Sequence, residues 1–136
     1  MAVRRVSYCY LTVPHRAGQG AEVLGALKDA KVNLLAYSGF PAKHGEAQLD
    51  LVARGVGPIK RVAKSNGWRV SKVKKAFLIQ GTDRVGAVHR HIRKLADAKI
   101  NVTAADAVCA GQGRFGLLLW VKGTDYARAA RALKAK

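Results

Sequence analysis

Acidic residues and cysteines are scarce in this 136-residue chain. It has 8 Asp and Glu residues against 25 Lys and Arg residues, so catalysis by paired carboxylates has few candidates. The two cysteines, Cys9 and Cys109, form no Cys-x-x-Cys pair and have no histidine at a zinc-binding spacing. We therefore expect no disulfide scaffold, no metal site and no cofactor, and each cysteine is predicted to be a buried structural thiol.

Long apolar runs are also missing. Arg4 and Arg5 near the amino terminus are not followed by an apolar segment of signal-peptide length. No stretch approaches the length of a membrane span. These absences predict a cytoplasmic protein that does not enter the membrane.

The shortage of acid leaves a formal net charge of +17 and an isoelectric point near 10.6. A charge of this size favours contact with polyanions. The Lys and Arg residues are nevertheless scattered and form no basic tail, which is typical of a solvated, salt-sensitive surface. Weak nucleic-acid binding therefore stays open as an alternative function.

The chain contains an internal repeat in which Arg16 recurs as Arg84, 68 positions later. The same shift pairs Gly18 with Gly86, Leu27 with Leu95, Asp29 with Asp97, Ala30 with Ala98, Lys31 with Lys99 and Asn33 with Asn101. A unit of about 68 residues is marginal in core size on its own. We therefore expect the two units to associate.

The apolar periodicity of each repeat alternates between strand and helix. In the first repeat it predicts strands over residues 8–13, 32–40, 48–54 and 68–71, with helices between the first two and from Pro58 to Ser65. This order is the split βαβ arrangement. The predicted fold class is α+β, with two ferredoxin-like (βαββαβ) units in tandem, residues 1–71 and 72–136, whose antiparallel sheets carry helices on one face.

The second unit reaches residue 136 where its fourth strand should begin, because the shift places Trp68 at that number. The strand predicted over residues 73–81 then lacks a neighbour on one side. An uncovered sheet edge has to stay open, be charged, or pair with other chain. The amino-terminal residues and a second copy of the protein are the two candidates to fill it.

The second repeat resembles the ACT domain family, whose pattern is a strand, Asp-Arg-x-Gly, a helix ending in Leu-x-x-Ala-x-Ile-Asn-Val, and a β-hairpin. The residues that carry this resemblance are Asp83, Arg84, Gly86, Leu95, Ala98, Ile100, Asn101 and Val102. The first repeat has His15 in place of the acid. The resemblance implies a non-catalytic regulatory module that binds an amino acid or similar small zwitterion at the interface between units, coupled to oligomerisation. A degenerate module that only dimerises is the alternative.

The predicted ligand-binding residues are Asp83, Arg84, Gly86 and Asn101 in the second unit and His15, Arg16, Gly18 and Asn33 in the first. A glycine where a strand turns into a helix leaves backbone N–H groups open to an anion, and a neighbouring Arg adds a bidentate donor. Each glycine could instead serve turn geometry alone, and each asparagine could close a loop after its helix. Asp83 could bind an ammonium group or be the helix N-cap.

The histidines do not indicate an enzyme. His89 and His91 are two positions apart on a predicted helix, so they point to different faces and cannot chelate one metal ion. Both are predicted to lie on the surface. His15 and His44 have no adjacent nucleophile or carboxylate, and the protein is predicted to be non-enzymatic.

The 68-residue shift also predicts which side chains lie on each face of the second sheet. Phe115 and Leu117 should face the helices, which leaves Leu118 and Trp120 on the opposite face. With Tyr8 and Tyr10, these two residues predict an apolar open face that is covered by a homodimer or by the other unit. RNA stacking on sheet aromatics is the alternative, and the inward phase of Phe115 disfavours it.

Overall fold

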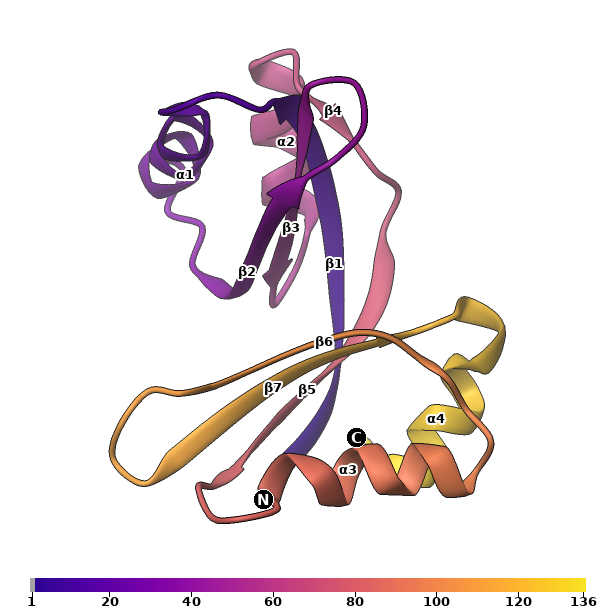
Figure 1. Ribbon diagram of the computed structural model, residues 1–136. Coiled ribbons are helices and arrows are strands. Elements are labelled where there is room, and N and C mark those ends of the chain that lie inside the picture. The colour runs from indigo at the N-terminus through magenta and orange to yellow at the C-terminus, as the bar shows by residue number, and fades with distance from the viewer. Residues whose placement is uncertain (1) are drawn as a thin grey trace. The chain divides into compact units, whose positions relative to one another are not determined.

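The computed structural model describes residues 2–136 (Figure 1). This part of the chain divides into an N-terminal unit, Ser7–Lys74, and a C-terminal unit, which combines residues 2–6 with Lys75–Lys136. The division near Lys74 lies close to the boundary expected after residue 71. The opening residues differ from the expectation, because the long first strand begins in the C-terminal unit.

The N-terminal unit is built around the later part of β1 (Ala2–Pro14). It continues through α1 (Gln19–Asp29), β2 (Leu34–Pro41), β3 (Glu46–Ala53), α2 (Gly57–Ser65) and β4 (Arg69–Val70). The strand order is β2-β3-β1-β4, with β1 antiparallel to β3 and β4. This is the ferredoxin-like βαββαβ order that the sequence predicted, with Pro58 in the first turn of α2.

The C-terminal unit repeats this arrangement through β5 (Lys74–Thr82), α3 (Ala87–Asp97), β6 (Val102–Cys109), β7 (Arg114–Val121), the short helix η1 (Gly123–Asp125) and α4 (Tyr126–Leu133). Its strand order is β6-β7-β5, with β1 on the other side of β5. Phe77 pairs with Leu119 across β5 and β7, as Cys9 pairs with Leu51 across β1 and β3. The fold class is α+β with two ferredoxin-like units.

The start of β1 takes the sheet position that a fourth strand of the C-terminal unit would occupy. Val3 belongs to the apolar core of that unit, and the Arg4 guanidinium donates to the Gln80 side chain at 3.3 Å. After α4, the Lys136 N–H donates to the Val3 carbonyl, and the Lys136 carbonyl accepts from the Arg5 N–H, both at 3.0 Å. The edge of β5 is therefore paired, which avoids the unpaired backbone groups of an open sheet edge.

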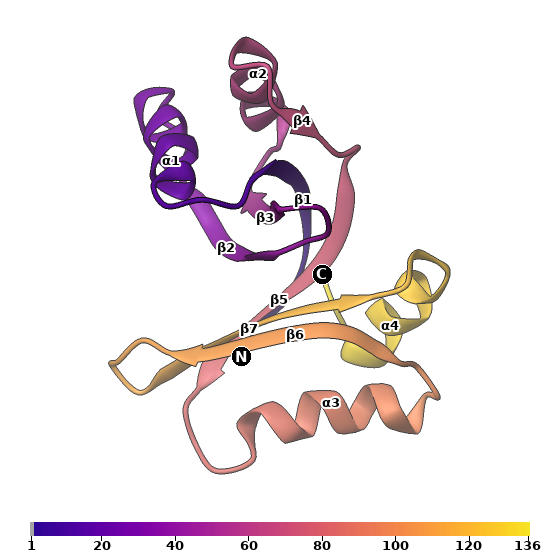
Figure 2. The same cartoon turned by 45° about the horizontal axis from the view of Figure 1, so that its top comes forward.

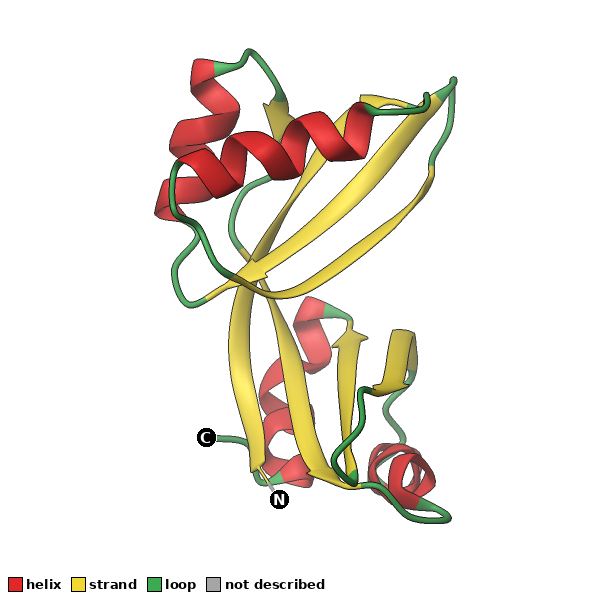
Figure 3. Ribbon diagram, turned by 90° about the vertical axis from the view of Figure 1, so that its left-hand side faces the viewer, coloured by secondary structure: helices red, strands yellow, loops and turns green. Residues whose placement is uncertain are grey.

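The helices of each unit lie on one face of its sheet (Figures 2 and 3). In the C-terminal unit, Phe115, Leu117 and Leu119 are buried in one cluster with Leu95 of α3 and Leu133 of α4. The predicted phase of β7 is thereby confirmed: its first aromatic ring faces the helices and is unavailable for base stacking. Leu49 and Leu51 are buried in the corresponding cluster of the N-terminal unit.

The side chains expected on an open sheet face have little exposed area. Tyr8 is 7% exposed, Leu118 5% and Trp120 6%, while Tyr10 is half-buried. A surface that is already buried in a single chain offers a dimer little further apolar area. Homodimerisation through these four residues stays a prediction.

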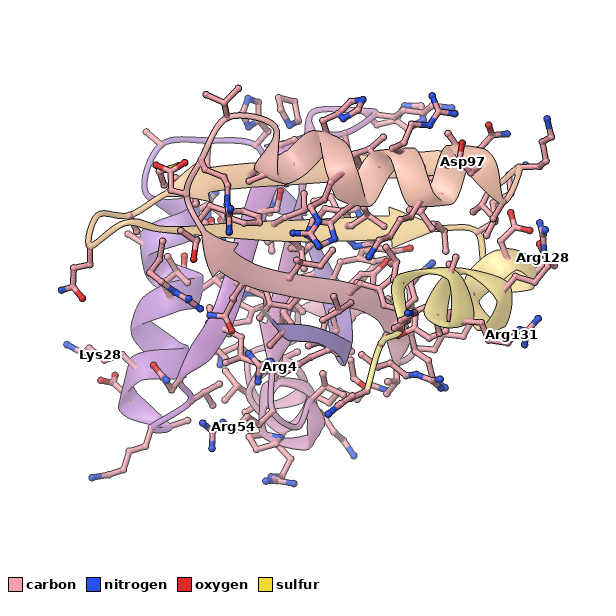
Figure 4. All side chains as sticks on the ribbon, turned by 90° about the horizontal axis from the view of Figure 1, so that it is seen from below. Arg4, Lys28, Arg54, Asp97, Arg128 and Arg131 are labelled. Carbon is pink, nitrogen blue, oxygen red and sulfur yellow. The ribbon has the colours of Figure 1, made fainter. Side chains whose placement is uncertain are left out.

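Charged side chains lie on the outer surfaces of the helices, as Figure 4 shows for Lys28 on α1 and Arg131 on α4. Arg93 contacts Asp97 at 2.8 Å, and Arg128 contacts Asp125 at 2.9 Å. Exposed pairs of this kind contribute about 0–1 kcal/mol each. These ion pairs therefore add little to stability, and the prediction that the scattered basic residues form a solvated, salt-sensitive surface stays a prediction.

Candidate functional site

The loop between β5 and α3 contains the acid and the base expected to bind a zwitterion. Asp83, Arg84 and Gly86 are all exposed. Gly86 is the residue immediately before α3 and has φ +82°, in the left-handed region that glycine adopts without strain. A Cβ at Gly86 would meet no atom within 4 Å, so the approach to the helix terminus is open as well. Turn geometry explains this glycine, and the open approach is compatible with a ligand.

Asp83 is not the N-cap of α3. The N-cap is Gly86, which has no side-chain capping bond, so the alternative role that the sequence allowed for Asp83 is wrong. The Asp83 N–H instead donates to the Gly113 carbonyl at 2.8 Å, which ties the loop to the β6–β7 turn. The N-terminal unit makes the same bond, from the His15 N–H to the Gly45 carbonyl at 2.8 Å. The carboxylate of Asp83 remains at the surface beside the helix terminus.

Cys109, the last residue of β6, is exposed and has no disulfide partner, so the prediction that it is buried was wrong. A hydrogen bond with Asp83 raises the pKa of the Cys109 thiol. Cys9 is fully buried as predicted, and burial raises the pKa of its thiol. The Cys109 thiol therefore lies beside the Asp83 carboxylate at the end of β6.

A groove of about 400 Å³ runs between this loop, the first turn of α3 and the end of β6. Its lining includes Asp83, Arg84, Gly86, His89, Val108, Cys109 and Phe115. The first four N–H groups of a helix lack intrahelical partners and carry a partial positive charge. The groove thus combines one carboxylate, one guanidinium and a helix N-terminus, which are complementary to the ammonium and carboxylate groups of a small zwitterion.

The N-terminal unit has a related but smaller groove of about 270 Å³, lined by His15, Arg16 and β2. Tyr37 reaches into it: the Tyr37 hydroxyl lies 3.3 Å from the position that a Cβ on Gly20 would take. The equivalent of Tyr37 in the other unit is Ala105. Gly18 has φ +87° at the start of α1, like Gly86, but does not line this groove. A phenol therefore fills space in the N-terminal unit that is open in the C-terminal one.

The predicted asparagines lie apart from the loops of their own units. Asn33 and Asn101 follow the carboxyl ends of α1 and α3, whereas the glycine loops precede the amino ends. An 11-residue helix is about 16 Å long, so one small ligand cannot contact both ends. Asn33 lines a separate depression with Arg54 and Pro58. The structure brings Asp83, Arg84 and Gly86 together and does not bring Asn101 to them.

His91 is fully buried, so its predicted surface position was wrong. Its ring lies under the first turns of α3, 6.2 Å from the Phe115 ring between centroids. Burial lowers the pKa of His91, and the positive charges of Lys94 and Arg90 lower it further. The helical spacing does indicate a buried position, since His91 is four residues before Leu95 and lies on the same apolar stripe. His89 is exposed as predicted.

Within residues 2–136, no group of three His, Cys, Asp or Glu side chains is arranged to hold a metal ion. No helix in the same range is long and apolar enough to cross a membrane.

No family model matches the sequence, and no similar sequence is found among curated proteins. Solved structures do share its fold. Protein BT0572 from Bacteroides thetaiotaomicron is 14% identical with a TM-score of 0.82, over 97% of this chain and 88% of that one. The ligand-free regulatory subunit of aspartate kinase from Thermus thermophilus is 13% identical with a TM-score of 0.63, over 98% and 93%.

A putative C-terminal regulatory domain of aspartate kinase from Porphyromonas gingivalis W83 gives 15% identity and a TM-score of 0.59, over 98% of this chain and 94% of that one. At such identities the likeness establishes the fold alone. It supports an ACT-like fold built from two ferredoxin-like units.

Proposed function

We propose that this chain is a non-catalytic regulatory protein that binds an amino acid or a similar small zwitterion in the groove of its C-terminal unit. The observation that carries the proposal is the pairing of Asp83 and Arg84 at the open amino end of α3. The carboxylate would bind the ligand's ammonium group, and Arg84 with the helix N–H groups would bind its carboxylate. The likeness to regulatory subunits of aspartate kinase supports a regulatory role.

We further propose that the N-terminal groove does not bind this ligand. His15 replaces the acid at the position of Asp83, so the partner for an ammonium group is missing. Tyr37 also occupies part of the groove, which is about 130 Å³ smaller (400 less 270) than the groove of the C-terminal unit. One chain then binds one ligand.

Binding is proposed to change the association of chains through the edge strand β6. Within residues 2–136 this strand pairs only with β7, and seven of its eight residues are exposed. Val108 is 66% exposed beside the groove, and Val85 of the loop is fully exposed. A second chain that covers this edge would bury both valines and enclose the ligand, so ligand and assembly would stabilise each other by mass action.

The first test is a thermal-shift screen of the full chain against the twenty amino acids. A ligand at 100 times its Kd stabilises the folded state by about 2.7 kcal/mol, a shift of several degrees for a protein of this size. Asp83→Asn should abolish the shift, while His15→Asn at the equivalent position should preserve it. A screen in which no zwitterion raises the melting temperature would refute the proposal.

A further inference from the structure

Residues 2–136 supply no hydrogen-bonding partner to either ring nitrogen of His91, although the side chain is fully buried. Unpaired buried polar atoms are unfavourable, and an apolar side chain of similar size would avoid that cost. The N-terminal unit has Val23 at the equivalent position, and Val23 is also fully buried. Packing alone therefore does not require an imidazole here, which indicates that the ring has a binding role.

His91 lines a second cavity of about 170 Å³, here called the inner cavity, together with loop residues such as Arg84 and Val85. The cavity shares Arg84, Gly86 and Phe115 with the groove described above, so the two adjoin at the amino end of α3. Its volume accommodates a carboxylate and a few water molecules. A ligand in the groove can therefore extend one end toward the imidazole.

The charges around this cavity favour an anion. Arg84 and Arg90 line it, and the amino end of α3 adds the partial positive charge of its N–H groups. Thr82 and Phe115, which face it from β5 and β7, carry no charge, and no acidic residue lines it. The lowered pKa of His91 keeps the ring neutral at pH 7, so that it offers one N–H donor and one acceptor nitrogen.

We propose that His91 is a recognition residue whose ring N–H donates a hydrogen bond to the carboxylate of the ligand. The acid end of the ligand then lies in the inner cavity, and the remainder lies in the groove beside Asp83. The position of that remainder rests on the proposed function. The anion site itself depends only on His91, Arg84, Arg90 and the helix terminus.

The test uses the full chain and sodium acetate as the probe, followed by NMR of the histidine ring and backbone amide signals. Sodium chloride at equal ionic strength controls for diffuse anion binding to a basic protein. Acetate should shift the ring signals of His91 and raise its titration midpoint, and should leave the ring signals of exposed His44, which lines neither cavity, unchanged. Chloride should produce neither effect.

His91→Val installs the residue of the equivalent position and should weaken acetate binding about tenfold or more, read from the amides of Gly86 and Ala87. His91→Gln retains a donor and should keep most of the affinity, and His44→Asn, at an exposed histidine of the other unit that lines neither cavity, should keep all of it. Unchanged acetate binding in His91→Val, or equal shifts with chloride, would overturn the inference.

The two proposals fail in different ways. If an amino acid binds His91→Val as tightly as the wild type, the inference is wrong and the proposed function stands. If acetate binds through His91 while no amino acid binds the chain, the anion site stands and the proposed function is wrong.

Discussion

The hydroxyl of Tyr37 lies 3.3 Å from the Cβ position of Gly20, whereas the equivalent pair in the other unit is Ala105 and Val88. The same strand and helix therefore enclose a partly filled groove in one unit and an open groove in the other. This difference is the basis for proposing that only the C-terminal groove binds the ligand, although the two repeats share one fold.

Calorimetric titration with an amino acid that stabilises the chain should give one site per chain. Tyr37→Ala enlarges the N-terminal groove, and with His15→Asp it should create a second site. Ala105→Tyr should reduce binding in the C-terminal unit, because the phenol would occupy its groove. Two equal sites in the wild-type chain would show that Tyr37 does not block the first groove.

Arg84→Gln should weaken the binding of the same amino acid by about 1.5–3 kcal/mol, the usual contribution of a charge-assisted hydrogen bond. This loss corresponds to a roughly 10- to 100-fold higher Kd. Arg16→Gln is the matched control, since Arg16 is the equivalent exposed loop residue of the other unit. Its Kd should stay within about twofold of the wild type. An equal loss of affinity in both variants would mean that binding depends on the net charge of the protein and not on the groove.

Stability should fall when the pH drops through 6.5. The folded chain binds a proton at His91 less readily than the unfolded chain, because burial and then Lys94 and Arg90 lower its pKa. Between the lowered pKa and 6.5 the unfolded state therefore binds more protons, and the free energy of unfolding decreases as the pH falls. Denaturant melts from pH 7.5 to 5 should show this loss in the wild type and a smaller one in His91→Val. Parallel pH profiles for the two proteins would exclude His91 as the cause.

Lys31 follows Ala30, the C-cap of α1, and has φ +60°, a conformation that favours glycine; its N–H donates to the Lys28 carbonyl at 2.9 Å. Lys31→Gly should raise the free energy of unfolding by about 0.5–1 kcal/mol, because glycine relieves the left-handed strain. Lys28→Gly, inside the helix, should lower it by about 1 kcal/mol. Destabilisation by both changes in chemical denaturation would contradict this account of the helix end.

The high positive charge should produce weak, salt-sensitive binding to RNA. Counterion release makes such binding fall steeply with salt, so fluorescence anisotropy should lose the signal between 50 and 200 mM salt. Phe115 faces the core and offers no stacking platform. Tight binding that survives 200 mM salt and is lost in Arg84→Gln would instead favour a nucleic-acid function.

The fold could be predicted well from the sequence because each element occurs twice, so that its two copies can be compared. Apolar stripes, Pro58 and the glycine loops fixed the order of helices and strands, and the phase of Leu117 followed from that of Leu49. The sequence left two candidates for the edge of β5, residues 2–6 and a second copy of the protein, since Val3 and Val6 indicate a strand but do not specify which strand they pair with. The structure places residues 2–6 there.

The candidate site can be derived from the sequence only in part. The Asp83 and Arg84 loop can be recognised because its residues are adjacent in sequence. The groove needs the far end of β6, where Val108 and Cys109 carry no motif of their own. The burial of His91 was not predicted, because its two-residue spacing from His89 was used only to exclude a metal pair. Its spacing of four residues from Leu95, which places it on the buried stripe of α3, was not used.

The most direct measurement of the central claim is NMR mapping of the full chain with an amino acid that stabilises it. Saturating ligand should shift the backbone amides of Asp83 to Ala87 and of Val108 and Cys109, and leave those of His15 to Gly18 in place. Shifts confined to the N-terminal groove, or spread evenly over the basic surface, would contradict a zwitterion site at the start of α3.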